Sequence, residues 1–398
     1  MKSSKEYLLE EIASFRRGSF PQPYGLDKWY DDQSGMPFVQ VYDVGNNGKL
    51  KHKTKRKISK EAAPFSVFAP KGTIIITIQG SIGKVAITQY DAYIDRTLLV
   101  IESFKIPLIK DFFAFILKEL FDMEKNKADG GIIKTINKEN LSKFKIKIPE
   151  SLEEQKRVAE ILTCVDNNID ITEQKIKKLE MIKEGMLEKL FNKGLGKNKL
   201  KDSELGLIPE NWNILSLEEM GNDIIRGASP RPQGDPRYYG GNVPRLMGAD
   251  VSRDGKVTIP KIDFLTEAGA KLSRFLPKGT LVITCSGDVA VPTFLGVDCC
   301  IHDGFIAFKQ ISELIDNRFL YYFFLKFKKE LEKVATDGGI FVNLTTSLIK
   351  ETKLALPPKE EQIQIVSILE KIDENIDVVK LKKEKLEQLK KGLLNELL

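Results

Sequence analysis

The chain has 398 residues, of which 42% are hydrophobic and 30% are charged, and its formal net charge at pH 7 is +6. These values describe an ordinary soluble protein with two or three domains. No apolar run approaches the roughly 20 residues that a membrane-spanning helix needs, and residues 1–6 are too polar to open a signal peptide. We therefore expect a cytoplasmic protein with no membrane partner.

The four cysteines lack the paired spacing of a zinc site, so we expect no metal centre and plain buried or semi-buried thiols. They are Cys164, Cys285, Cys299 and Cys300. Basic residues crowd residues 49–57. Such a run is most often a solvated face, so the charge permits nucleic-acid binding without establishing it.

Residues 1–150 are predicted to form a first domain of mixed α/β structure. A β-branched run over residues 72–78 predicts a strand, which ends in a polar, glycine-bearing turn. A second strand is expected at residues 84–88. An apolar, aromatic helix is expected over residues 109–124, before a glycine turn at residues 129–131.

Residues 151–193 are predicted to form one long central helix. From Glu153 onward, apolar residues recur at intervals of three and four, which is the period of a helix seam. Gly194 and Gly196 end this pattern, and residues 194–204 are expected to form a lysine-rich linker.

Residues 205–357 repeat the plan of the first domain, with a strand over 279–284, a polar loop over 285–288, a helix over 317–334 and a glycine turn over 337–339. Residues 358–398 repeat the long helix. The chain is therefore expected to contain a second globular domain followed by a C-terminal helix.

The two halves match at a fixed offset of 207 residues. Glu153-Glu154-Gln155 recurs as Glu360-Glu361-Gln362, and Asp166 recurs as Asp373. We predict two pseudo-symmetric α/β (mixed α+β) domains joined by two long antiparallel helices that form a coiled coil. Internal two-fold symmetry suits a target with two half-sites. The alternative is that each amphipathic helix packs only on its own domain.

Helix length provides a ruler for such a target. At 1.5 Å per residue, a helix of some 39 residues spans about 58 Å, which is roughly the rise of 17 base pairs.

Several motifs in this order resemble the specificity subunits of type I restriction-modification systems. Pro149 precedes the first Glu-Glu-Gln triplet, and Pro357-Pro358 precede the second. The second domain opens with the stretch Gly206-Leu207-Ile208-Pro209-Glu210-Asn211-Trp212, and the pattern Ile-Leu-x-x-x-Asp-x-x-Ile-Asp occurs at 161–170 and 368–377. The first domain has no counterpart to the Ile-Pro-x-x-Trp opening. The resemblance covers essentially the whole chain.

This resemblance implies a non-catalytic reader of double-stranded DNA with a bipartite site. Each target-recognition domain would read one half-site in the major groove. The helices would dock two methyltransferase subunits, which would use S-adenosylmethionine to methylate adenine N6 after flipping the base. Restriction and motor subunits would add cleavage that depends on ATP and magnesium. No cofactor is expected in this chain itself.

The residues themselves contain no recognisable catalytic motif. A glycine-rich methyltransferase loop, an Asn/Asp-Pro-Pro-aromatic motif and a phosphate-binding Gly-x-x-x-x-Gly-Lys-Ser/Thr loop are all missing from the sequence. His302 lies beside Cys299 and Cys300, but it aligns with Asp95 of the first half, which argues against shared chemistry. A structural histidine, or a polar group that faces DNA, remains as its interpretation.

Polar residues in the loops that both domains share are the candidate DNA contacts. Arg and Lys suit guanine edges or phosphates, whereas Asn and Gln suit adenine. The alternative for each residue is turn chemistry or solvated charge, and Asn343 could cap the turn that follows it. The candidates are Arg16, Arg17, Ser19, Gln22, Gln79, Ser81, Lys84 and Lys134 in the first domain, and Arg226, Ser229, Arg231, Arg237, Tyr238, Tyr239, Ser286, Asp288 and Asn343 in the second.

Two other classes of function stay open on the residues alone. A coiled-coil adaptor without DNA binding would bind its partners with little dependence on salt, whereas DNA affinity falls steeply as salt rises. A self-sufficient DNA-modifying enzyme would bind its cofactor without any partner chain.

Overall fold

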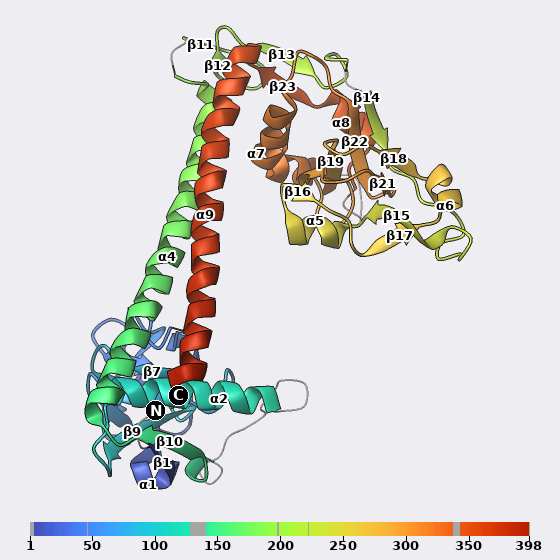
Figure 1. Cartoon of the computed structure of the whole chain (residues 1–398). Coiled ribbons are helices and arrows are strands. Elements are labelled where there is room, and N and C mark those ends of the chain that lie inside the picture. The colour runs from blue at the N-terminus through green and yellow to red at the C-terminus, as the bar shows by residue number, and fades with distance from the viewer. Residues whose placement is uncertain are drawn as a thin grey trace. The chain divides into compact units, whose positions relative to one another are not determined.

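The computed structural model describes residues 4–45, 47–127, 141–196, 199–221, 223–336 and 343–397. The chain divides into two compact units. The first unit is Met1–Lys175 with Val379–Leu398, and the second unit is Ile176–Val378. Each unit therefore contains one sheet-rich domain and a part of each long helix (Figure 1).

The first unit is a mixed α/β domain with two four-stranded sheets, in the orders β2-β9-β6-β7 and β4-β3-β8-β5, and a two-stranded β1-β10 pair. Its strands are β1 (Ser4–Leu8), β2 (Ala13–Arg17), β3 (Met36–Val39), β4 (Arg56–Ile58), β5 (Val67–Ala69), β6 (Ile74–Thr77), β7 (Val85–Ile87), β8 (Ala92–Ile94), β9 (Leu98–Phe104) and β10 (Lys145–Pro149). Its helices before the spacer are α1 (Leu9–Ile12) and α2 (Lys110–Lys127), with short 3-10 turns at Asp27–Trp29, Val41–Asp43 and Ala63–Phe65.

Strand β6 shows how this core is built. Its isoleucines point alternately to the two faces of the sheet, as the two-residue period of a strand requires. Ile74 and Ile76 pack in the cluster that contains Phe113 and Leu117 of α2, whereas Ile75 packs in the cluster that contains Val39 of β3. The central sheet is therefore covered by α2 on one face and by the second sheet on the other.

The second unit repeats this plan with a five-stranded sheet, β14-β22-β19-β20-β16, a four-stranded sheet, β17-β15-β21-β18, and two short pairs, β13-β23 and β11-β12. Its strands are β11 (Leu200–Lys201), β12 (Ile208–Pro209), β13 (Asn213–Ser216), β14 (Asp223–Arg226), β15 (Tyr239–Leu246), β16 (Val257–Thr258), β17 (Asp263–Leu265), β18 (Arg274–Leu276), β19 (Leu281–Thr284), β20 (Pro292–Leu295), β21 (Cys299–Ile301), β22 (Phe305–Gln310) and β23 (Lys353–Leu356). Its short helices are α5 (Gly248–Asp254), α6 (Glu267–Leu272) and α8 (Thr346–Glu351), and α7 (Asn317–Thr336) corresponds to α2.

Strand β19 repeats the alternation of β6. Leu281 and Ile283 pack with Phe319 of α7, whereas Val282 packs with Leu246 of β15. The predicted duplication of the mixed α/β domain is confirmed at the level of individual core side chains.

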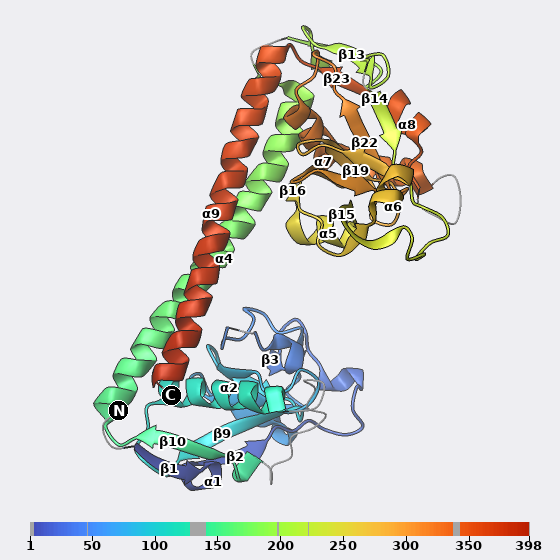
Figure 2. The ribbon, with the colours of Figure 1, turned by 45° about the vertical axis from the view of Figure 1, so that its right-hand side comes forward.

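The two long helices, α4 (Leu152–Lys193) and α9 (Lys359–Leu397), run antiparallel within each unit. In the first unit Lys390 of α9 pairs with Asp166 of α4. In the second unit Lys183 of α4 pairs with Asp373 of α9 at 2.6 Å. Figures 1 and 2 show the helices side by side from both directions. The predicted antiparallel pair is confirmed, and the alternative that each helix packs only on its own domain is wrong.

The glutamine of each Glu-Glu-Gln triplet joins its helix to its domain. In the first unit the buried side chain of Gln155 accepts from the Ile109 N–H at 2.9 Å and donates to the Pro149 carbonyl at 2.8 Å. In the second unit Gln362 accepts from the Asp316 N–H at 2.8 Å. The repeated triplet is therefore a structural joint between the start of the spacer helix and the loop before α2 or α7.

The Ile-Pro-x-x-Trp stretch has its own structural role in the second unit. Trp212 is fully buried, and its indole Nε1 donates to Glu361 at 3.1 Å. The same carboxylate accepts from the Leu195 N–H at 3.2 Å, just after α4 ends. The motif thus fastens the start of the second domain to the start of α9.

A lysine also fastens each domain to the side of a spacer helix. Lys49 donates to Asn167 of α4 at 3.1 Å, and Lys256, at the equivalent position, donates to Glu370 of α9 at 3.2 Å. These contacts lie within the first and the second unit, respectively, and they orient each domain on its own helix segment.

Two expectations drawn from composition can be compared with the structure. No helix in the described part of the chain is both long and apolar enough to cross a membrane. Cys285, Cys299 and Cys300 are buried as predicted, but Cys164 is exposed. Its neighbours Leu162 and Val165 face the core from α4, so the helical period turns Cys164 towards solvent.

Candidate nucleic-acid interface

Each unit places the same seven-residue turn at the end of a strand of its central sheet. Residues 17–23 begin at the last residue of β2 and residues 226–232 at the last residue of β14, and both have the sequence Arg-Gly-x-x-Pro-x-Pro. We name these segments the arginine turns. The peptide bonds Gln22–Pro23 and Arg231–Pro232 are cis in both. The two turns are equivalents in sequence and in position.

The glycine of each arginine turn lies against the loop between β8 and β9, or between β21 and β22. A Cβ atom on Gly18 would lie 2.3 Å from the carbonyl oxygen of Asp95, and one on Gly227 would lie 2.1 Å from that of His302. Both distances are far below van der Waals contact, so any other residue would displace the turn. Close backbone approach explains why glycine follows the arginine in both copies.

The arginine of each turn is an anchor to the same loop. Nε of Arg17 donates to the backbone carbonyl of Arg96, and Nε of Arg226 donates to the backbone carbonyl of Asp303 at 2.7 Å. In the second unit Nη2 of Arg226 also donates to Asn343 Oδ1 at 3.3 Å. These two arginines therefore hold the turn in place within the fold.

The glycine loops that follow β6 and β19 are a second matched pair. Thr77 Oγ1 donates to the Ser81 carbonyl at 2.5 Å, and Thr284 Oγ1 donates to the Asp288 carbonyl at 2.5 Å. The backbone of the loop is thus held from inside by a buried threonine in both units. The side chains of Ser81 and Asp288 remain exposed at the loop tips.

Four of the predicted contact residues of the second unit gather around Asp303. Ser229 Oγ donates to Asp303 Oδ1 at 2.6 Å, and Arg231 Nη2 lies 3.8 Å from Asp303 Oδ2. The hydrogen bond from Ser229 and, more weakly, the charge of Arg231 lower the pKa of Asp303, so it is ionised at neutral pH. Arg226 donates to the backbone carbonyl of Asp303 and also to the side chain of Asn343, so Asn343 lies in the same cluster.

Ser286 joins this cluster through the backbone, because it forms an isolated antiparallel bridge with Asn343. Asn343 is exposed and its side chain accepts from Arg226. The cap is supplied instead by Thr345, whose side chain accepts from the Leu348 N–H at the start of α8. Asn343 is therefore not the helix cap.

The remaining predictions for the second unit are more dispersed. Tyr239 lies close to the arginine turn, since its hydroxyl donates to the Pro230 carbonyl at 2.8 Å. Arg237 is bound by Asp235 through a 2.6 Å ion pair and lies 5.4 Å from the Tyr238 ring. Asp288, at the tip of the glycine loop, pairs with Lys328 of α7 at 2.5 Å.

In the first unit, Gln22 is exposed on the arginine turn, and Ser19 Oγ donates to the Phe65 carbonyl at 2.9 Å. Arg16 lies one residue earlier on β2 and pairs with Glu102 of β9 at 2.8 Å. Lys84 is half-buried and donates to the Val44 carbonyl at 3.3 Å.

Gln79 and Ser81 lie on the glycine loop of the first unit, half-buried and exposed, respectively. Lys134 is a predicted contact that lies outside the described residues. No single cluster in the described part of the first unit gathers its candidates as Asp303 does in the second.

Sequence reasoning missed the loop that receives the arginine turns. Arg96 of the first unit and Asp303 of the second occupy the same position with opposite charge. The available signal was the Arg-Gly-x-x-Pro-x-Pro repeat, which recurs at an offset of 209. A comparison at the dominant offset of 207 does not align it.

Sequence reasoning also missed an exposed tyrosine pair in the first unit. Gln40 donates to the Tyr24 hydroxyl at 2.7 Å and accepts from Tyr42. Tyr24 in turn donates to Asp95 at 3.2 Å. Burial and the charge of Asp95 raise the pKa of Tyr24, so this hydroxyl stays a neutral donor.

His302 has a structural role in the loop. Its Nδ1 accepts from the Gly304 N–H at 2.9 Å, just as Asp95 Oδ1 accepts from the Thr97 N–H at 3.0 Å. Burial and nearby Arg245 lower the pKa of His302, so it is neutral at pH 7. Across the described residues no group of three His, Cys, Asp or Glu side chains is placed to hold a metal ion.

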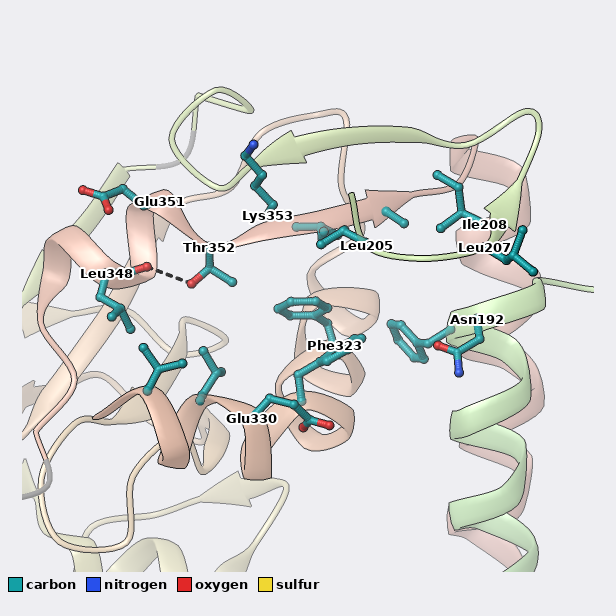
Figure 3. A pocket seen from close by; sticks show the side chains of 16 residues that line it. Asn192, Leu205, Leu207, Ile208, Phe323, Glu330, Leu348, Glu351, Thr352 and Lys353 are labelled. Carbon is teal, nitrogen blue, oxygen red and sulfur yellow. Dashed lines mark hydrogen bonds between the residues drawn. The ribbon is translucent and has the colours of Figure 1, made fainter. Parts of the chain in front are cut away.

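An apolar groove of about 430 Å³ lies elsewhere in the second unit, between the end of α4, α7 and the β23 region (Figure 3). Leu205, Leu207 and Phe323 are among its lining residues, and Thr352 Oγ1 donates to the Leu348 carbonyl at 2.8 Å on its wall. None of the predicted DNA contacts lines this groove.

Comparison with known proteins places the chain in a family. A model of the type I restriction modification DNA specificity domain matches residues 1–181 and again residues 209–388. The chain belongs to the type I restriction-modification DNA specificity family. The two matches fall on the two halves that carry the arginine turns.

Similar curated proteins bear names of the same kind. The putative type I restriction enzyme MjaX specificity subunit of Methanocaldococcus jannaschii is 35% identical over 269 residues, which are 66% of this chain and 60% of that protein. The type I restriction enzyme MjaVIII specificity subunit of the same organism is 32% identical over 307 residues, or 72% of this chain and 68% of that protein. The first of these matches thus spans under two thirds of its relative.

Solved structures share the fold at low sequence identity. The type I restriction-modification S subunit from M. genitalium superposes with a TM-score of 0.62 and 16% identity, covering 99% of this chain and 96% of that one. A chain from a structure on complex assembly and conformational transition of the type I restriction-modification system has a TM-score of 0.60 and 16% identity, with coverages of 100% and 98%. Two sheet-rich domains joined by long helices are therefore the fold of this family.

Proposed function

We propose that the chain is the DNA sequence-specificity subunit of a type I restriction-modification complex, and that its two domains read the two halves of a bipartite DNA site. The observation that carries this proposal is the duplicated arginine turn and glycine loop. Their backbone anchors are the same in both units, whereas their exposed side chains differ. A common scaffold with different polar groups suits two different base sequences.

The chain itself acts without catalysis in this proposal. Its sequence contains no cofactor or phosphate-binding motif. Partner methyltransferase subunits supply S-adenosylmethionine chemistry at adenine N6. Restriction and motor subunits supply cleavage with ATP and magnesium. The complex works on host DNA in the cytoplasm.

The spacer helices dock two methyltransferase subunits, one on each unit. Equivalent apolar side chains lie exposed on the helices in support of this assignment. Ile171 is 64% exposed in the first unit, and Val378, at the equivalent position, is 67% exposed in the second. Ile182 and Leu389 form a second equivalent pair, 52% and 51% exposed. The support is the repetition of these exposed aliphatic residues at equivalent positions of the two units, which suits the docking of one partner subunit on each.

The decisive experiment maps methylated adenines. The chain is co-expressed with the methyltransferase subunit of its own system, and the host DNA is analysed by single-molecule sequencing. We expect N6-methyladenine in one bipartite motif, with one modified adenine in each half and an unread gap between the halves. A matched strain that lacks only this chain should show no such motif.

Two results would contradict the proposal. Equal methylation in the strain without the chain would show that the methyltransferase reads DNA by itself. Binding of the purified complex to a cognate duplex that does not weaken between 50 and 200 mM salt would instead favour an adaptor without phosphate contacts.

A further inference from the structure

Two positions of the arginine turns, and one position of the loop that receives them, differ between the units and lie together in the second unit. In the second unit these positions form the contact set around the Asp303 carboxylate, which joins Ser229 to Arg231. In the first unit Phe20 stands in place of Ser229, Gln22 in place of Arg231 and Arg96 in place of Asp303. The exchange changes a hydroxyl, a cation and an anion at once, while the anchoring arginine and glycine stay the same.

In the second unit, Arg231 lies beside an anion and is open to solvent. Asp303 binds Ser229 with one carboxylate oxygen and lies 3.8 Å from one terminal nitrogen of Arg231 with the other. The Arg231 side chain is still 70% exposed. One nitrogen thus faces a carboxylate at ion-pair distance, and the guanidinium fork is available to a ligand.

In the first unit, the equivalent side chain is an uncharged amide. Gln22 is exposed, and its side chain has no hydrogen-bond partner among the described residues. Phe20 is buried, with its ring centroid 4.6 Å from that of Phe38. Arg96 lies 5.0 Å from the centroid of the Tyr24 ring. The anion beside Arg231 is replaced by a cation, which would repel an arginine at position 22.

The anchoring arginines are unsuited to distinguish the half-sites. Arg17 and Arg226 are the same residue in both units and use Nε for the same backbone contact. Identical groups in identical places cannot account for two different base sequences. The side chain that differs on the same rigid turn, at position 22 or 231, can do so.

We propose that Gln22 and Arg231 are equivalent base-reading side chains, Gln22 for an adenine in the first half-site and Arg231 for a guanine in the second. Asp303 is a positioning residue for Arg231. This inference rests on the proposed function. Its chemistry is that a carboxamide pairs with adenine N6 and N7, whereas a guanidinium pairs with guanine O6 and N7.

Exchange of the two side chains tests this assignment. Arg231→Gln and Gln22→Arg are each introduced into the chain, which is co-expressed with its methyltransferase subunits. The target is a plasmid library in which both half-sites are randomised one position at a time. Methylated fractions are read by single-molecule sequencing. Lys309→Gln, an exposed site at the far end of β22, removes one positive charge as the matched control.

We expect Arg231→Gln to lower methylation about tenfold to a hundredfold at sites with guanine at one position of the second half-site, and to favour adenine there. Gln22→Arg should cause the converse change at one position of the first half-site. In each variant the unaltered half-site keeps its sequence preference, which shows that the chain is folded. Lys309→Gln should leave every base preference unchanged.

Asp303→Asn tests the positioning role. Alone, it should weaken the guanine preference at the position that Arg231 reads, and in the Arg231→Gln background it should cause no further change at that position. An equal effect of Asp303→Asn in both backgrounds would show a merely structural role.

Unchanged base preferences in both exchange variants would overturn the base-reading assignment. A uniform loss of methylation on all sequences with Arg231→Gln would overturn it too, because that is the signature of a phosphate contact. These outcomes leave the bipartite motif of the wild-type complex intact. Absence of that motif in the wild-type complex would overturn the proposed function, and this inference with it.

Discussion

At the residue scale, the duplicated chain separates side chains that build the fold from side chains that can vary. Gln155 and Gln362 are identical and buried, and both the amide oxygen and the amide nitrogen of each are hydrogen-bonded. Gln22 and Arg231 are different, exposed and nearly free of intramolecular partners. A residue that appears in both copies with the same contacts has a structural explanation within the chain itself.

The buried glutamine provides a stability prediction. Gln362→Ala removes the partner of the Asp316 N–H and of the carbonyls of Leu314 and Pro357. Buried polar groups without partners cost about 1–3 kcal/mol each when no water replaces the bond. We expect the second unit to lose about 2–3 kcal/mol of its free energy of unfolding.

Fluorescence can follow this unit alone. The chain has two tryptophans, Trp29 in the first unit and Trp212 in the second. In a Trp29→Phe background, denaturant unfolding monitored by fluorescence reports Trp212, which is buried beside the mutated joint. Gln364→Ala, on the exposed side of the same helix turn, is the control and should change stability by under about 0.5 kcal/mol. Equal effects of the two variants would show that Gln362 does not join α9 to the second domain.

At the element scale, α4 and α9 are joined in each unit by a lysine–aspartate ion pair in their apolar seam. Lys183 binds Asp373 at 2.6 Å, with side chains that are 22% and 17% exposed. Tyr322 of α7 donates to the same carboxylate at 2.6 Å. Asp373 therefore joins α4, α7 and α9 at one point of the second unit, and burial with this contact raises the pKa of Tyr322.

Asp373→Asn should loosen this junction. The amide keeps an acceptor for Tyr322 but leaves the Lys183 ammonium without its counter-charge. Because the pair is partly exposed, we expect a loss of about 1–2 kcal/mol, below the cost for a fully buried pair. Glu374→Gln, exposed on the same helix, removes one negative charge as the control. Thermal unfolding at low and high salt should show a larger shift for Asp373→Asn at both. A shift that vanishes at high salt would mean only a surface charge effect.

Elements with strong local signals could be predicted from the sequence. The helix expected over 317–334 is observed as α7 (Asn317–Thr336), and the strand expected at residues 84–88 is observed as β7 (Val85–Ile87). Apolar period and glycine turns determine such elements locally. The contacts of the interface depend instead on residues distant in sequence.

The anchoring role of Arg226 illustrates this limit, since its partner carbonyl belongs to Asp303, 77 residues away in the sequence. The local sequence identifies Arg226 only as a cation near glycine and proline, which led to its prediction as a DNA contact. Likewise, no local pattern shows that Arg96 and Asp303 receive equivalent turns. Tertiary pairing decides which polar groups are used inside the fold and which remain available.

At the scale of the whole molecule, the duplication produces two domains with the same fold and different exposed side chains. Each domain has its own core, its own arginine turn and its own joint to the spacer helices. A domain with separate contacts of this kind should be exchangeable without disturbing the other.

This modularity can be tested by replacing residues 205–357 with the same region of a related specificity subunit. The replaced segment begins after α4 and ends at Pro357, just before α9, so both spacer helices stay native. The donor subunit is chosen to carry an Ile-Pro-x-x-Trp opening, so that its tryptophan can still donate to Glu361.

We expect the mapped methylation motif to keep the first half-site and the gap length, and to acquire the donor's half-site in place of the second. The reciprocal exchange of residues 1–150 is the matched control and should alter the first half-site alone. A chimera that changes both halves would show that the two domains read DNA jointly, and the assignment of one half-site to each arginine turn would then have to be abandoned.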